Sequence, residues 1–158
     1  MKRARLMAGA ALLCAVLPAS AQDVGGGKAV FEQRCAVCHQ AGGVGQDGLA
    51  PPLTASPGRY VLTEAGRKAL ARVGLYGMYG AIESGGKHYN GSMPSFRALP
   101  DAELADVLNY LVFGLSAATR PGDAAPYRPE EVAALRAQPV AGNEVHRQRM
   151  AVLGEGAK

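Results

Sequence analysis

The sequence contains few of the residues that build disulfide-rich or membrane-spanning proteins. It contains three cysteines in 158 residues, and one of them, Cys14, lies in an apolar stretch near the N-terminus. The remaining pair, Cys35 and Cys38, is too small for a disulfide framework. Beyond the N-terminal stretch, no segment approaches the roughly 20 apolar residues that a transmembrane helix needs. No segment alternates polar and apolar residues, so strands are not expected.

Residues 1–21 have the features of an export signal and not of a folded segment. Their opening is basic, the apolar stretch 6–17 is too short to span a bilayer comfortably, and residues 19–21 form a small-x-small cleavage site. We expect cleavage before Gln22, which would remove Cys14 with the signal. The alternative is an N-terminal membrane anchor.

The charge of the chain is nearly balanced once this leader is set aside. The formal net charge is +4, but three of the 17 basic residues and none of the 13 acidic residues lie in residues 1–21. Residues 22–158 therefore carry 14 basic and 13 acidic side chains, a net charge of +1. This balance gives no reason to expect a nucleic-acid or other polyanionic partner.

The pattern of apolar residues predicts a mostly helical chain. We expect a short helix over residues 26–38 and the clearest helix near 101–113, where apolar residues recur at steps of three and four. Residues 64–83 are compatible with short helical pieces, although their glycines weaken that prediction. The Gly- and Pro-rich segments 40–58 and 84–98 are expected to be loops.

The composition changes after residue 115. We expect one domain over residues 22–115 and a C-terminal extension over 116–158, with a linker and a short helix that opens at Pro129 and carries Val132 and Leu135. The final residues have weak apolar anchors. They either wrap the domain or stay partly disordered.

The segment RCAVCHQ places Cys35, Cys38 and His39 within five residues. A redox dithiol of the thioredoxin kind belongs at a helix start after a strand, which the sequence does not offer. A structural zinc site needs four ligands, and no further cysteine remains in the mature chain. Covalent haem attachment fits best, with one vinyl group for each thiol and His39 as an axial iron ligand.

The sixth iron ligand then decides the function, because a thioether there gives an electron carrier and an open position gives gas binding or peroxide chemistry. We predict Met93, which lies in a loop between the turn residues Asn90-Gly91 and Pro94. His88 is the main rival. The full set of candidates is Met78, His88, Met93, His146 and Met150.

Four segments in order resemble a class I cytochrome c of the bacterial periplasmic kind: GKAVFEQRCAVCH, LAPPL, YNGSMPSF and LPDAELADVLNYLVFG. The resemblance covers about residues 24–115 and implies an all-α cytochrome c fold wrapped around one haem. It also implies that Gly27 and Phe31 on the first helix pack against Tyr110 on the last.

The resemblance further implies which residues surround the haem. The carbonyl of Pro51 or Pro52 would accept a hydrogen bond from His39, with Pro52 the better alignment. Tyr89 and Asn90 would line the haem crevice. The propionates would lie near Arg59, Tyr60 or Tyr89, although the chain lacks the Trp that many relatives use there.

These expectations define an electron carrier and not an enzyme. It would hold one covalently bound haem c with His39 and Met93 on the iron. It would act in the periplasm with redox partner proteins, a periplasmic dehydrogenase and/or a terminal oxidase or reductase, either as the electron acceptor or as the cytochrome subunit of such a dehydrogenase. Neither nucleic acid nor stable membrane insertion is expected. The alternative is a haem sensor or peroxidase-like enzyme whose sixth ligand is open or displaceable.

Overall fold

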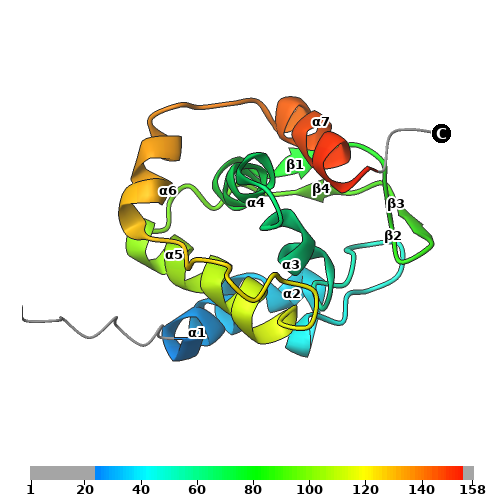
Figure 1. Ribbon diagram of the computed structural model, residues 1–158. Helices are drawn as coiled ribbons and strands as arrows, with labels where there is room; N and C mark the ends of the chain where they lie inside the picture. The colour runs from blue at the N-terminus through cyan, green and yellow to red at the C-terminus, as the bar shows by residue number, and fades with distance from the viewer. Residues whose placement is uncertain (1–23, 155–158) are drawn as a thin grey trace, which may run out of the picture.

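The computed structural model describes residues 24–154 and is built mainly of helices (Figure 1). The predicted leader, residues 1–21, lies outside the described residues, as do residues 22–23 and 155–158. In chain order the helical elements are α1 (Val24–Arg34), α2 (Ala36–His39), η1 (Ala41–Gly43), α3 (Ser56–Tyr60), α4 (Glu64–Tyr76), α5 (Asp101–Asn109), η2 (Tyr110–Leu115), α6 (Pro129–Arg136) and α7 (Gly142–Leu153). The strands are β1 (Met78–Tyr79), β2 (Ile82–Ser84), β3 (Lys87–Tyr89) and β4 (Ser92–Met93).

Helices α1 and α5 cross at close range, as the family resemblance implied. Gly27 lies at the crossing, and a Cβ there would collide with the Asp106 carbonyl oxygen. One turn later the Phe31 ring is fully buried, with its centroid 5.5 Å from that of Tyr110. The predicted helix over residues 26–38 is confirmed, with a break at Cys35 between α1 and α2.

Helix α4 begins and ends at residues that explain its length. The Thr63 hydroxyl accepts a hydrogen bond from the Gly66 N–H at 3.0 Å, which caps the first turn. Gly77 ends the helix with a φ of 66°, a conformation that a helix cannot continue through. The short helical pieces expected beyond residue 76 are therefore wrong, because the chain turns and enters strands there.

The expectation that the chain has no strands also needs correction. Strands β1 and β4 pair antiparallel with Met78 opposite Met93, and β2 pairs with β3 with Ile82 opposite Tyr89. Each strand has only two or three residues. An alternating pattern cannot be recognised over so few positions.

The predicted helix near 101–113 is confirmed and runs slightly further than expected. Its last part, η2, is a π-helix that ends at Leu115 and not at Gly114. The Ser116 N–H and hydroxyl both donate to the Leu111 carbonyl oxygen, at 3.0 and 2.6 Å. This wider last turn is closed by Ser116. Within residues 24–154, no helix has both the length and the apolar character that crossing a bilayer requires.

The C-terminal extension packs on the rest of the molecule. After α5 and η2 the chain returns along α5, forms the predicted α6, and crosses over to α7 beside α4 (Figure 1). Of the two outcomes left open for these final residues, residues 116–154 wrap the domain. Val132 of α6 and Val145 of α7 are both 0% exposed, so each helix buries an apolar side chain against it.

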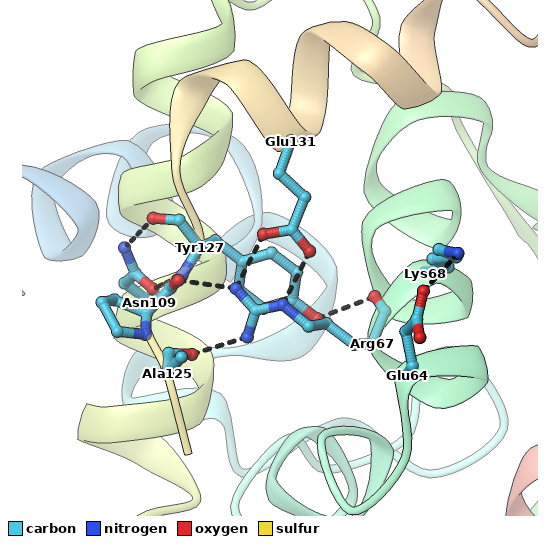
Figure 2. A network of polar contacts seen from close by, with 8 residues as sticks. Glu64, Arg67, Lys68, Asn109, Ala125, Tyr127 and Glu131 are labelled. Carbon is cyan, nitrogen blue, oxygen red and sulfur yellow. Dashed lines mark hydrogen bonds and ion pairs between the residues drawn. The ribbon is translucent and has the colours of Figure 1, made fainter. Parts of the chain in front are cut away.

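A polar network fastens the first part of the extension (Figure 2). The Arg67 guanidinium donates to both carboxylate oxygens of Glu131, at 2.6 and 2.8 Å, and to the carbonyl oxygens of Ala125 and Pro126. It lies 3.9 Å above the Tyr127 ring. The Asn109 side chain and the Tyr127 backbone exchange two hydrogen bonds, at 2.7 and 3.0 Å. This network holds α6 against α4 and α5.

Candidate functional site

One cavity gathers most of the residues that the sequence singled out. Its walls come from the cysteine motif, the segment after residue 48, helices α4 and α5, and strands β1 and β4. Apart from the residues discussed below, the lining is mainly apolar and includes Leu49, Leu70, Val73, Ile82, Leu104, Val107, Leu108 and Leu111. A large planar apolar group with a polar edge fits such a lining.

Cys35, Cys38 and His39 lie together on the wall formed by the break between α1 and α2. The Cys35 N–H donates to the Phe31 carbonyl and the His39 N–H donates to the Cys35 carbonyl, at 2.8 and 3.0 Å. Both thiols are free. Burial, with a smaller contribution from Cys38, raises the pKa of the Cys35 thiol to about 11. Redox dithiols have lowered thiol pKa values, so this environment does not suit that chemistry.

The zinc interpretation lacks the ligands that it needs. Within residues 24–154, no group of three or more His, Cys, Asp or Glu side chains lies close enough together to hold a metal ion. The two cysteines and His39 instead line a cavity whose other residues are mostly apolar. A porphyrin with two vinyl groups suits this lining better than a closed four-ligand site does.

His39 is buried and oriented by a backbone carbonyl. Its Nδ1 lies 2.8 Å from the carbonyl oxygen of Pro51, so Nδ1 carries the proton and Nε2 keeps a lone pair for a ligand bond. Burial lowers the pKa of His39, although the hydrogen bond to Pro51 partly opposes this. The ring is therefore held in the neutral form that binds metals.

The preference for Pro52 as the partner of His39 is wrong, because the acceptor is Pro51. Pro52 is also absent from the cavity lining, which includes Pro51. The backbone pairing of Gln46 with Ala50 turns the chain directly before Pro51. The residue that follows this turn, Pro51, presents its carbonyl oxygen to the His39 ring.

Met93 lines the cavity from β4, in a segment that is fastened to the end of α4. The Ser95 hydroxyl donates to the Leu75 carbonyl at 2.6 Å, and the Phe96 N–H donates to the Gly74 carbonyl at 3.1 Å. A Cβ on Gly77 would lie 2.7 Å from the Pro94 carbonyl carbon, so the two segments touch there. This segment holds the Met93 backbone firmly.

The rival sixth ligands divide into two groups. His88, His146 and Met150 do not line the cavity in the part of the chain that the structure describes. His146 instead places Nε2 2.7 Å from the Ala81 carbonyl oxygen. Met78 does line the cavity, directly opposite Met93 in the β1–β4 pair. Of the five candidates, only these two neighbouring methionines line the cavity in the described part of the chain.

The residues expected in the haem crevice and near the propionates differ in where they lie. Tyr60 and Tyr89 are buried and line the cavity. Asn90 is exposed and outside the lining, because Tyr89 turns inward and the next residue of an extended chain turns outward. Its placement in the crevice is wrong. Arg59 is exposed as well, and its Nη2 donates to the Leu153 carbonyl at 3.3 Å.

Arg149 is the cavity residue that the sequence reasoning missed. It is 4% exposed and is the one Arg or Lys among the described residues of the lining, which include no Asp or Glu. Its Nη1 lies 3.6 Å from the Met150 sulfur. Val145, Arg149 and Leu153 are all buried and follow one another at four-residue steps on α7. An arginine in the apolar row of a helix was the signal available.

Comparison with known proteins agrees with this site. A family model described as cytochrome c matches residues 24–113. The chain is 39% identical over 123 residues to cytochrome c-552 of Thermus thermophilus, covering 78% of this chain and 93% of that relative. A second cytochrome c-552, also from Thermus thermophilus, has the same identity and length of match and is covered to 82%.

The helical fold, the cysteine motif and the cavity beside it are all accounted for by one family. Its members are electron carriers that work with redox partner proteins. The chain belongs to the cytochrome c family, and it is therefore an electron-transfer protein with the all-α cytochrome c fold and covalently bound haem c with its iron.

Proposed function

We propose that this cytochrome is a one-electron carrier in which Cys35 and Cys38 attach the haem and His39 and Met93 are the axial ligands. The observation that carries the proposal is that all four side chains line one cavity, with the His39 Nδ1 already bound to Pro51. These residues would hold a haem whose iron, when bound, would supply one-electron chemistry between Fe(III) and Fe(II).

The protein residues act by holding their positions in both oxidation states. The hydrogen bond from His39 to Pro51 fixes the imidazole plane. The Met93 backbone is fixed by its pairing with Met78 and by the contacts of the following residues with α4. The apolar lining excludes water. Little has to move when the charge on the iron changes, so electron transfer is fast.

Arg149 is the residue best placed to pair with a haem propionate. Its side chain is 4% exposed and lies in the wall of a cavity whose described lining residues include no Asp or Glu. Haem carries two carboxylates of its own, and a carboxylate buried there needs a positive or hydrogen-bonding partner. Tyr60 and Tyr89, which also line the cavity, offer hydroxyl groups for the same purpose.

We further propose that the protein acts in the periplasm after removal of residues 1–21. Its donor would be a periplasmic dehydrogenase, and its acceptor a terminal oxidase or reductase. Exposed apolar side chains near the cysteine motif support docking of a partner there, namely Val37 at 75%, Val44 at 63% and Leu49 at 47% exposed. The net charge of +1 for residues 22–158 favours recognition by local contacts over long-range steering.

The ligand assignment is tested by comparing Met93→Ala with Met78→Ala. Met93→Ala is expected to remove the long-wavelength sulfur-to-iron band of the ferric protein, to lower the reduction potential and to let the ferrous protein bind carbon monoxide. Met78→Ala, which truncates the methionine directly opposite, is the matched control and should keep the band.

Other outcomes would change the proposal. If Met78→Ala removes the band and Met93→Ala keeps it, the ligand is Met78. If the wild-type protein lacks the band and binds carbon monoxide, the sixth position is open or labile. The chain would then be a haem sensor or a peroxidase-like enzyme.

A further inference from the structure

The last helix of the extension lies directly against the sheet that contains Met93. Figure 1 shows α7 beside β1 and α4, and these are the elements that it contacts most. Strand β1 is in turn paired with β4, so β1 contacts both α7 and the strand that contains Met93. The extension thus reaches a part of the haem site far from it in sequence.

Helix α7 contacts β1 through its own first residue, Gly142. A Cβ on Gly142 would lie 2.9 Å from Cε1 and 3.0 Å from Cδ1 of the Tyr79 ring, and 3.5 Å from the Met78 Cα. A side chain at this position would press on the Tyr79 ring, whereas the Met78 Cα lies at an ordinary contact distance. The start of α7 therefore packs against the Tyr79 ring beside Met78.

Two further residues of α7 extend this contact along the sheets. Val145 is 0% exposed and packs in a cluster with Met78, Ile82 and Tyr89, against which Met93 also packs. His146 places Nε2 2.7 Å from the Ala81 carbonyl oxygen, in the turn between β1 and β2. Successive parts of α7 thus cover β1, the turn and β2.

A two-residue ladder needs such cover, because a bare two-stranded ribbon is marginally stable in water. The Met78–Met93 pair belongs to a ladder of this length. We propose that α7 positions the sixth iron ligand: by holding β1 in place it keeps the Met93 sulfur on the iron and makes external ligands compete poorly. This inference rests on the proposed ligation by Met93.

The test uses the full-length ferric holoprotein and titrates it with imidazole, which competes for the sixth position. Val145→Ala removes two methyl groups from the cluster behind Met78 and is expected to tighten imidazole binding about fivefold. The matched control is Val132→Ala, the same change at another 0% exposed valine of the extension, in α6. That variant should lower overall stability and leave the imidazole affinity unchanged.

A second pair of variants tests the close approach of α7. Gly142→Ala, whose added Cβ presses on the Tyr79 ring beside Met78, should also tighten imidazole binding. Gly122→Ala, where an added Cβ meets nothing within 4 Å, should not.

The proposal is overturned if Val145→Ala and Val132→Ala change the affinity equally or not at all. Met93→Ala in the same titration separates this failure from failure of the ligation itself. If Met93→Ala binds imidazole no more tightly than the wild type, Met93 is not the ligand and both proposals fall. If Met93→Ala binds it much more tightly and Val145→Ala does not, only the role of α7 is wrong.

Discussion

At the scale of single residues, one buried charge distinguishes the haem site from its apolar walls. Arg149 reaches the cavity from α7, a helix in the extension that follows the predicted cytochrome domain. A positive charge near the iron favours the ferrous form, because the ferric form carries one more positive charge. The residue therefore raises the reduction potential if it pairs with a propionate and remains close to the haem.

Arg149→Leu is accordingly expected to lower the midpoint potential by about 50 mV, close to a tenfold change in a one-electron equilibrium. Arg149→Lys keeps the charge and should recover most of that loss. The control is Arg147→Leu, which removes an arginine that is exposed on the same helix and pairs with Glu144. Spectroelectrochemical titration of the four proteins measures the effect. Equal shifts for Arg147→Leu and Arg149→Leu would contradict the assignment.

At the scale of elements, the helix with a regular apolar repeat could be predicted, whereas α7, the full length of α4 and the strands could not. Residues 101–113 repeat their apolar positions often enough to identify a helix without its surroundings. Strands β1 to β4 are too short for any period, and they exist because Gly77 ends α4 and turns the chain back. Tertiary pairing, not local propensity, creates them.

The linker before α6 is held by Tyr127, whose hydroxyl donates to the Arg67 carbonyl at 2.8 Å. Burial raises the pKa of Tyr127 well above its usual range, which Arg67 only partly offsets. Because the folded-state pKa is raised, this residue stabilises the fold below the unfolded pKa of about 10. That contribution is lost as the pH rises further, by about 1.4 kcal/mol per pH unit.

Tyr127→Phe is expected to be less stable than the wild type by about 1 kcal/mol at pH 8, because a buried hydrogen bond is lost. At about pH 11 the difference should shrink by about 1 kcal/mol or reverse, since phenylalanine cannot ionise in the unfolded chain. Urea unfolding at both pH values measures this. Tyr79→Phe, the same change at an exposed tyrosine, is the control. A difference between Tyr127→Phe and the wild type that is the same at both pH values would refute the explanation.

At the scale of the whole molecule, the part of the site that is local in sequence was predictable, and the part supplied by packing was not. The cavity contains Cys35, Cys38, His39 and Met93, which short motifs identified. The choice between Pro51 and Pro52 depended on how one turn closes. The presence of Arg149 in the cavity depends on where α7 packs, more than a hundred residues after the cysteine motif. No local sequence pattern determines that packing.

The position of α7 has a consequence for how the protein is assembled. The cysteine motif is near the start of the described chain, and the helix that covers β1 is near its end. If residues 1–21 direct export, as proposed above, the thiols would cross the membrane before the last wall of the cavity. A variant that ends at Ala141 is expected to acquire covalent haem as completely as the full-length chain, measured by haem staining and mass. Incomplete attachment would mean that α7 must be in place first.

On this view the extension closes the site after attachment and takes no part in loading the haem. The cavity would then be open while the thiols react and would be closed by α7 afterwards. The order of the segments along the chain would become the order in which the cofactor is loaded and sealed in.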